Sequence, residues 1–491
     1  MKAYQDASLA PVRRAKALLE EMTLAEKIGQ LNQRLYGFRI YERKCVNGED
    51  TIELSEEFCQ EVEKYSGLGV LYGLYRADPW ADKDYETGLT GVLSKKAYNQ
   101  VQRYVLEHSR LGIPVMMSSE CPHGHQALDG YLLPVNLLAG ATFDPAMVRA
   151  AYRVSGRQLQ NMGVDLALMS MLDVLRDPRW GRSEECYSED PYLSARMAEA
   201  AVIGMQESGP EVVAKHFAAQ GEGTGGVNAS AARIGERELR EIHFPPAAAA
   251  IKAGAKGIMA AYNEIDGVYC HANRWLLNDV IRKEMGFDGI VMSDGVAIDQ
   301  LDSMTGDNVV SGALALQSGV DVGLWDEAFG KLEEAVRRGL VKEAQIDQAV
   351  LRVLTLKFER GLFEHPYLEE EGEIHMDYAQ NPESVQLARE GLVILQNKNQ
   401  GLPFWENQAS GKKIAVIGPN ADDLYNQLGD YTPPLRRDDG ITVLDGMKLI
   451  FKESDIRFSQ GCYLRKRDEN LLKEAVDTVK NSDIVICVLG G

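Results

Sequence analysis

Short apolar segments recur along the first two-thirds of the chain, and most of them close on a polar or aromatic residue. These segments occupy 67–73, 113–120, 165–175, 212–217, 257–263, 286–294 and 320–325. Apolar runs of this length, bounded by glycine or turn-forming residues, are typical of buried strands in a parallel sheet. Stretches with helical spacing separate them. The alternation predicts an α/β fold, and specifically a TIM-like (β/α) barrel.

Helical periodicity is clearest where a start signal precedes it. Thr23 and Glu26 have the spacing of a capping box, and Leu24, Ile28, Leu31 and Leu35 follow at helical intervals. Further helices are expected at 94–108, 145–162, 192–207, 236–253, 274–285, 309–318 and 329–360. Residues 37–66 are charged and carry no clear pattern.

The pattern changes after residue 360. Residues 361–382 are rich in acidic and turn-forming residues and are expected to be a linker between a barrel domain at 1–360 and a second domain at 383–491. A helix at 383–397 and apolar strands at 413–420 and 484–489 predict an α/β sandwich with a mainly parallel sheet. The sequence stops directly after the last apolar run, so we expect this domain to be incomplete, with its C-terminal part missing.

The net charge and the cysteine content exclude some classes of partner and indicate the redox compartment. The net charge is −20, which argues against nucleic acid and anionic membrane surfaces as partners. The seven cysteines are scattered without CxxC or zinc-type spacing, so free, buried thiols in a reducing compartment are expected. No apolar run approaches the ~18 residues of a membrane span and no signal-peptide core is evident, which predicts a cytoplasmic protein.

Chemistry-bearing side chains collect at or just after the ends of the predicted strands. They are Glu120, Arg182, Lys215, His216, Tyr262, Asp294 and Trp325. The carboxyl ends of barrel strands meet at one face, where barrel enzymes have their active sites. Carboxylates, cations, imidazole and aromatic rings together suit a polar, uncharged ligand with many hydroxyl groups. The glycine-rich loop at 221–230 lacks the pattern of a phosphate-binding loop.

Several long motifs resemble glycoside hydrolase family 3, which contains β-glucosidases and β-xylosidases. They include MTLAEKIGQL at 22–31, LRDPRWGRSEECYSEDP at 175–191, AKHFAAQG at 214–221, GFDGIVMSDG at 286–295 and KIAVIGPNAD at 413–422. The motifs occur in the family's order. The resemblance implies a barrel followed by an α/β sandwich, and hydrolysis of terminal β-D-glycosides by a retaining two-carboxylate mechanism.

The resemblance also implies residue roles. Asp294, in the SD motif, would be the catalytic nucleophile. Lys215 and His216 match the sugar-binding KHF pair, Arg182 matches the WGR motif, and Tyr262 matches AYN. Glu120 would grip distal sugar hydroxyls. Neighbouring cations would favour the ionised form of Asp294, which nucleophilic attack requires.

Two departures from the family pattern affect these expectations. Gly295 follows the nucleophile where the family often has tryptophan, so Trp325 or a loop would have to form the wall of the leaving-group site and contribute to substrate binding. The family's usual acid/base glutamate lies in the second domain and is expected beyond residue 491. Gln220 and Glu222 stand where the family's N-acetylglucosaminidases carry a His-Asp pair, and glutamine cannot transfer a proton.

The sequence leaves alternatives open beside a β-glucosidase. They are a β-xylosidase, an N-acetylglucosaminidase-type member, a non-catalytic sugar-binding fragment without its acid, and an aldolase that uses Lys215 as a Schiff-base amine. The last would need an apolar pocket that depresses the lysine pKa. We expect a glycoside or oligosaccharide substrate, no cofactor and no metal; His123, His125 and His271 are expected to be structural hydrogen bonders. The oligomeric state stays open.

Overall fold

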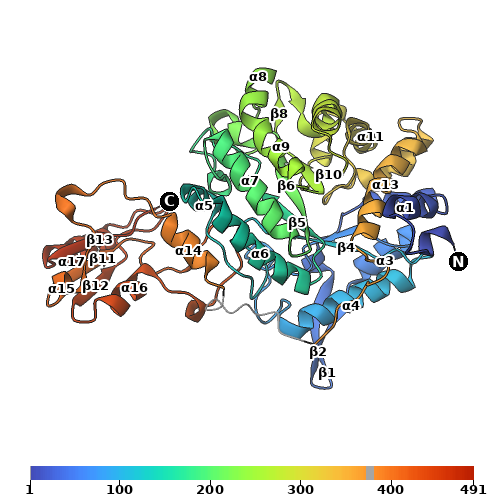
Figure 1. Cartoon of the computed structure of the whole chain (residues 1–491). Coiled ribbons are helices and arrows are strands. Elements are labelled where there is room, and N and C mark those ends of the chain that lie inside the picture. Colours follow the sequence, from blue (N-terminus) through green and yellow to red (C-terminus); the bar gives the residue numbers. More distant parts are fainter. Residues whose placement is uncertain (1, 372–380, 491) are drawn as a thin grey trace. The chain divides into compact units, whose positions relative to one another are not determined.

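The computed structural model describes residues 2–371 and 381–490 (Figure 1). The chain divides into two compact units. Unit 1 contains residues 1–392 together with the short segment 430–434, and unit 2 contains 393–429 and 435–491. The expected linker at 361–382 lies partly outside the described residues, since 372–380 are not described.

A parallel six-stranded sheet forms the centre of unit 1 (Figure 1). Its order is β10-β7-β6-β5-β4-β3. The strands are β3 (Val70–Tyr72), β4 (Met116–Glu120), β5 (Leu166–Ser170), β6 (Glu211–Phe217), β7 (Gly257–Ala260) and β10 (Ile290–Met292). Almost every strand residue is buried, as expected when helices cover one face and the barrel interior the other. Six of the seven expected strands are therefore confirmed.

Two irregular segments close this sheet into a barrel. Val322 bridges to Met292 at one edge, and Tyr36 bridges to Tyr72 at the other. The backbone N–H groups of Gly323 and Trp325 then donate to the carbonyl oxygens of Leu31 and Gln33, respectively. The segments around 31–36 and 320–325 thus take the two remaining barrel positions. The first was expected to be helix, but helix α2 (Leu24–Leu31) ends before it.

Helices pack around the barrel strands (Figure 1). The main ones are α1 (Pro11–Leu19), α2, α4 (Gly91–Glu107), α6 (Pro145–Asn161), α7 (Pro191–Gln206), α9 (Phe244–Lys252), η8 (Trp275–Glu284), α11 (Asn308–Ser318) and α13 (Glu343–Glu359). Further helices are α3 (Glu56–Tyr65), α5 (Asn136–Ala141), α8 (Glu236–Glu238), α10 (Asp302–Thr305), α12 (Leu332–Arg337) and α14 (Glu383–Glu390). The capping box of α2 is formed: Thr23 Oγ1 accepts from the Glu26 backbone, and the Glu26 carboxylate accepts from Thr23 N.

Two expectations about local structure are wrong, and one stretch without an assignment has regular structure. The helix expected over 329–360 is broken between α12 and α13, around Gly339, whose φ is +70°. The helix expected over 383–397 ends at Glu390. The charged stretch at 37–66 holds a hairpin, β1 (Tyr41–Val46) and β2 (Glu49–Leu54), turning at Asn47-Gly48. Both turn residues have positive φ, which Asn-Gly adopts readily, so this turn signal was available in the sequence.

The boundary between the units also falls later than expected. Helix α14 packs with α5 and α6 of unit 1. Ser384 N bonds to the Tyr131 hydroxyl, and Ser384 Oγ donates to the Leu132 carbonyl. Because these contacts tie α14 to the barrel, unit 1 continues to residue 392 rather than ending at 360.

Unit 2 contains a parallel three-stranded sheet in the order β12-β11-β13. The strands are β11 (Lys413–Ile417), β12 (Asp455–Ser459) and β13 (Ile484–Cys487), and the helices are α15 (Glu406–Ala409), α16 (Val443–Ile450) and α17 (Glu469–Lys480). Ile414 and Val416 pack against Leu444 of α16.

Two short strands of unit 1, β8 (Glu264–Ile265) and β9 (Val268–Tyr269), form a separate hairpin.

All seven cysteines are free, as expected, but only Cys121, Cys186 and Cys270 are buried; Cys45 and Cys487 are exposed. In the described part of the chain, no helix is both long and apolar enough to cross a membrane.

Candidate active site

The expected site residues of unit 1 meet at the carboxyl ends of the barrel strands. Glu120 ends β4, Lys215 and His216 lie near the end of β6, and Asp294 follows β10. Neighbouring residues of a strand normally point to opposite faces. Lys215 and His216 both reach the site because the pairing of β6 with β7 shifts register between Lys215 and Phe217. Such irregularities redirect side chains next to active sites.

Asp294 presents one engaged and one free carboxylate oxygen. Oδ1 accepts from the backbone N–H of Gly295 at 2.8 Å. Oδ2 is buried and has no hydrogen-bond partner among the described residues, although His216 Nε2 lies 3.5 Å away. The backbone N–H of Asp294 donates to His271 Nε2 at 3.1 Å. The side chain is thus fixed at one end, with Oδ2 free to react.

The hydrogen-bond roles of the two His216 nitrogens follow from its partners. Arg182 Nη2, which can only donate, lies 3.1 Å from His216 Nε2, so Nε2 accepts. His216 Nδ1 then donates to Asp173 Oδ2 at 2.7 Å. In this arrangement His216 does not consume the free oxygen of Asp294.

Arg182 is held by a neighbouring carboxylate. Its Nε lies 2.5 Å from Glu185 Oε1 and its Nη2 lies 2.8 Å from Glu185 Oε2, which is a bidentate pair. Burial would raise the pKa of Glu185, but the Arg182 charge outweighs it and holds that pKa far below its usual value. Arg182 is thus paired with Glu185 and also reaches His216.

Lys215 and Glu120 form a second buried ion pair. Lys215 Nζ lies 2.5 Å from Glu120 Oε2, and the Tyr72 hydroxyl donates to Glu120 Oε1 at 3.3 Å. Burial alone would lower the pKa of Lys215, but the charge of Glu120 outweighs it and the pKa lies above its usual value. A Schiff-base amine needs the opposite shift, so the aldolase reading receives no support.

Tyr262 and Trp325 lie beside Gly295, the residue that follows Asp294. The Tyr262 hydroxyl donates to the Gly295 carbonyl at 2.9 Å. Burial, followed by the charge of Asp294, raises the pKa of Tyr262, which keeps the phenol protonated. A Cβ built on Gly295 would lie 2.5 Å from Trp325 Cε3. Both aromatic residues therefore border the residue that follows Asp294.

Tyr431 is a site residue that the sequence analysis missed. It lies on the 430–434 segment of unit 1, and Lys215 Nζ is 4.5 Å from the centre of its ring. The guanidinium groups of Arg182 and Arg76 are each 5.7 Å from the same centre. Burial raises the pKa of Tyr431 to about 12. No periodic pattern marks this tyrosine, which follows Gly429-Asp430 in a loop.

The histidines expected to be structural make hydrogen bonds. His123 Nδ1 contacts the Asp430 carbonyl at 2.6 Å and His125 Nε2 contacts Ser119 Oγ at 2.9 Å. Burial lowers the pKa of His271 to about 4, so it is neutral and can accept from Asp294 N. Within the described ranges, no group of three or more His, Cys, Asp or Glu side chains could hold a metal ion.

Gln220 and Glu222 are both engaged elsewhere. Gln220 is buried and donates to Asn228 Oδ1 at 3.2 Å, while its carbonyl oxygen accepts from Tyr262 N at 3.3 Å. Glu222 Oε2 lies 3.4 Å from His243 Nε2 and 3.3 Å from Arg176 Nε, and these neighbours, His243 first, lower the pKa of Glu222. Neither residue is arranged as a proton donor, which weakens the N-acetylglucosaminidase reading.

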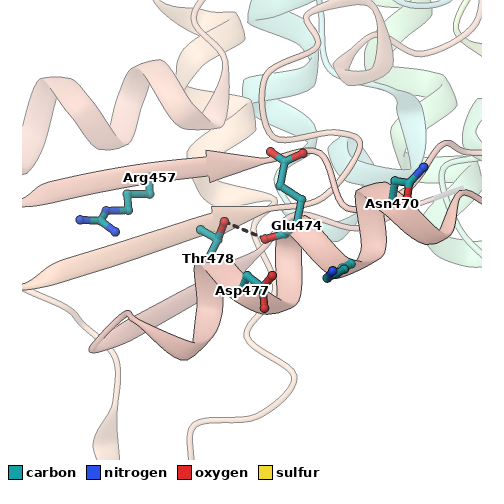
Figure 2. Close-up of a pocket in the computed structure, with 6 residues that line it drawn as sticks. Arg457, Asn470, Glu474, Asp477 and Thr478 are labelled. Carbon is teal, nitrogen blue, oxygen red and sulfur yellow. Dashed lines mark hydrogen bonds between the residues drawn. The ribbon is translucent and has the colours of Figure 1, made fainter.

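A hollow on unit 2 does not have the features of a catalytic site. It encloses about 450 Å³ beside α17, and Arg457, Asn470, Lys473, Glu474, Asp477 and Thr478 line it. Figure 2 shows Asn470, Glu474, Asp477 and Thr478 on helix α17 and Arg457 on strand β12, with the Thr478 hydroxyl bonded to the Glu474 carbonyl. None of the six is buried, so nothing there is desolvated or constrained as in the barrel site.

A closed (β/α) barrel with a charged, buried site at the carboxyl ends of its strands is the architecture of a barrel-fold catalytic domain. Residues 23–356 match the glycosyl hydrolase family 3 N terminal domain, and residues 392–491 match the glycosyl hydrolase family 3 C-terminal domain. The chain belongs to glycoside hydrolase family 3.

Individual relatives agree with this assignment. The chain is 32% identical to a beta-xylosidase of Formosa agariphila over 84% of this chain and 62% of that protein. It is 30% identical to a periplasmic beta-glucosidase of Salmonella typhimurium over 96% of this chain and 61% of the relative. A solved structure of beta-glucosidase from Listeria innocua in complex with glucose has a TM-score of 0.83 at 28% identity, covering 98% of this chain and 64% of that one. The chain thus spans about three-fifths of the length of these relatives.

Proposed function

We propose that the protein hydrolyses terminal, non-reducing β-D-glycosides, most readily β-D-glucosides, with retention of configuration. The observation that carries this proposal is the state of Asp294, whose Oδ1 is fixed by Gly295 N while Oδ2 is buried and unpartnered. In the proposed first step, Oδ2 attacks the anomeric carbon, and the leaving group departs with the bonding electrons. Water then cleaves the glycosyl ester.

The surrounding residues support an uncharged sugar as the bound group. Lys215, Arg182 and Glu120 are each already neutralised by a partner, so the site holds charged donors and acceptors without a large excess of either sign. Hydroxyl groups of a sugar can insert into such pairs as charge-assisted hydrogen-bond partners. A sugar that lacks one of these hydroxyls would leave a buried charge without its partner, which is the basis of selectivity.

Proton donation to the leaving group requires a further group. Three carboxylates of the site, Glu120, Asp173 and Glu185, each accept from a basic side chain. None of these three is arranged as a protonated acid. The barrel is therefore assigned the nucleophile and the sugar contacts, while the acid/base role belongs to another residue of the protein.

The β-xylosidase alternative rests on the beta-xylosidase of Formosa agariphila, which resembles the chain as closely as the glucosidases do. Xylose lacks the hydroxymethyl group of glucose, so the two sugars distinguish the readings directly.

A cytoplasmic location remains part of the proposal, supported by seven cysteines that form no disulfide.

The deciding experiment is intact-mass analysis after incubation with 2,4-dinitrophenyl 2-deoxy-2-fluoro-β-D-glucoside. Dinitrophenolate departs with little acid assistance, so labelling reports on the nucleophile alone. We expect one fluoroglucosyl adduct on Asp294, faster than with the xylose analogue. Asp294→Ala should abolish it. Asp288→Asn, which alters an exposed carboxylate at the opposite end of the same strand, should not. No adduct from a folded sample with either sugar would contradict the proposal and favour a sugar-binding protein without turnover.

A further inference from the structure

Asp294, the proposed nucleophile, lies between two contacts with the irregular segment that closes the barrel after β10. On one side of Asp294, the backbone N–H of Ser293 donates to the Val322 carbonyl at 2.8 Å. On the other side, the backbone N–H of Val296 donates to the Leu324 carbonyl, also at 2.8 Å. The backbone around Asp294 is therefore fixed from both directions by a later part of the chain.

Two residues of these contacting turns have an unusual backbone conformation. The φ of Val296 is +61° and that of Trp325 is +62°, both in the left-handed region that favours glycine. For a β-branched residue such as Val296, this conformation is a true outlier. Strained residues of this kind persist only where surrounding contacts hold them, and they concentrate at functional sites. The turn that carries Asp294 therefore depends on a contact that holds it in place.

Asp326 provides such a contact, because its buried side chain accepts four hydrogen bonds. Its Oδ2 accepts from the Ser293 hydroxyl at 2.6 Å and from Leu324 N at 3.1 Å. Its Oδ1 accepts from Ile298 N at 2.9 Å and from Asp299 N at 3.2 Å. One carboxylate thus joins the residue before the proposed nucleophile to the residues that follow the turn.

Asp299 makes the reciprocal contacts. Its Oδ2 accepts from Glu327 N and its Oδ1 accepts from Ala328 N, each at 2.9 Å. Asp326 and Asp299 therefore each bind backbone N–H groups beside the other. The donors in the four contacts of Asp326 are uncharged, whereas the three site carboxylates described above each accept from a basic side chain. Burying a carboxylate among uncharged donors costs stability, and its retention is explained by what it holds in place.

We propose that Asp326 is a positioning residue, which acts on Asp294 through the Ser293 hydroxyl. This inference rests on the proposed glycosidase function. Attack requires Asp294 Oδ2 to lie close to the anomeric carbon and in line with the breaking bond, and a misplacement of about 1 Å can cost roughly 100-fold in rate. Ser293 is held at both its N–H and its hydroxyl, which fixes the peptide bond that leads into Asp294. Asp326 therefore sets the direction of the attacking carboxylate through its neighbour in the chain.

Labelling kinetics with two reagents test the proposal. Asp294 Oδ2 forms the same bond to the anomeric carbon of the dinitrophenyl fluoroglucoside and of 2-deoxy-2-fluoro-β-D-glucosyl fluoride, while dinitrophenolate or fluoride departs with the bonding electron pair. Asp326→Asn keeps the side-chain shape but replaces Oδ2 with an NH2 group, which cannot accept from Ser293 or Leu324. We expect the maximal labelling rate to fall roughly 10- to 100-fold with both reagents, and the half-saturating concentration to stay within about twofold.

Ser293→Ala removes the hydroxyl that links Asp326 to Asp294. We expect a similar fall in the maximal rate, and the double variant with Asp326→Asn should stay within about twofold of the slower single variant, because both changes break one link. Losses that multiply in the double variant would show that Asp326 does not act through Ser293, and would overturn the proposal. Ser293→Ala also decides the question if Asp326→Asn does not fold, since wild-type labelling of Ser293→Ala would overturn it.

Asp165→Asn is the matched control. Asp165 is also a buried carboxylate that accepts from a backbone N–H, that of Met117 at 2.8 Å, but it directly precedes β5 at the amino end of that strand. Urea denaturation should show a loss of stability in both Asp→Asn variants, while labelling slows only in Asp326→Asn. Equal slowing in Asp165→Asn, or wild-type labelling of Asp326→Asn, would overturn the positioning role. A wild-type protein that neither reagent labels would instead overturn the proposed function, on which this role rests.

Discussion

Lys215 and Glu120 form an ion pair across two barrel strands, with Nζ and Oε2 2.5 Å apart and both side chains buried. Neither charge is exposed to solvent, so each depends on the other for compensation. The Tyr72 hydroxyl also donates to the second carboxylate oxygen of Glu120. Its energetics therefore affect both the fold of the barrel and the affinity of the site.

Removal of one partner should destabilise the barrel strongly. Lys215→Met leaves Glu120 buried without a counter-charge, and we expect the free energy of unfolding to fall by about 3–5 kcal/mol. The double variant with Glu120→Leu should lose less than Lys215→Met alone. Urea denaturation measures both. Lys256→Met breaks the half-exposed pair with Glu359 and should cost below about 1 kcal/mol. If Lys215→Met lowers the free energy of unfolding no more than this control does, the interpretation is contradicted.

Asp173 should act through His216 as a positioning residue. Asp173→Asn removes the charge that fixes the Nδ1 proton of His216, so the imidazole can adopt the other tautomer and donate to Asp294 Oδ2. We expect labelling by the dinitrophenyl fluoroglucoside to slow by roughly 10- to 100-fold, as for other supporting residues that orient a histidine. The pH profile of labelling should also shift, which a merely structural role would not cause. An unchanged profile and rate would exclude this role.

Gly295→Ala should distort the wall of the site. The added Cβ would overlap the Trp325 ring and lie 3.3 Å from the Tyr262 hydroxyl. Overpacking of this kind costs about 1–3 kcal/mol, measurable as a lower urea midpoint. The labelling rate should fall for fluoride and dinitrophenyl reagents alike, because Asp294, the proposed nucleophile, is itself displaced. Gly339→Ala adds a Cβ that meets no neighbour, although its positive φ is strained, and should leave labelling intact. Full activity of Gly295→Ala would show that the indole moves freely.

Stability should decline in mild acid through buried histidines. Burial lowers the pKa of His125 to about 3, against about 6.5 in the unfolded chain. The unfolded state therefore binds a proton between these values and the folded state does not, so stability is complete above pH ~6.5 and falls as the pH drops. From pH 6.5 to 5 this one group should remove about 2 kcal/mol. Urea titrations of His125→Gln should show a shallower pH slope; an identical slope would contradict the assignment.

The face that carries the candidate site was predictable, because each apolar run indicates where a strand ends. Asp294, Lys215 and Glu120 each follow such a run, and the structure brings them to one site. His216 was identified beside Lys215, but only the register shift in β6 explains how two consecutive residues reach the same site. Such a shift depends on the pairing of β6 with β7, so the sequence of β6 alone does not predict it.

Other parts of the molecule depend on contacts between distant segments. The first and last barrel positions, around 31–36 and 320–325, are closed by hydrogen bonds from Gly323 and Trp325 rather than by a strong strand pattern. The break between α12 and α13 follows from a glycine whose positive φ ends a helix. Tyr431 was missed because its role arises from three cations that lie far away in sequence.

The position of Tyr431 has a consequence for synthesis of the chain. Residues 1–360 contain every barrel strand, but the tyrosine that covers Lys215 follows 71 residues after Arg360. At translation rates of 5–20 residues per second, this separation corresponds to roughly 4–14 s. During that interval the nascent barrel has its cations without their aromatic cover. The electrostatic environment around Lys215 is thus the last part of unit 1 to mature on the ribosome.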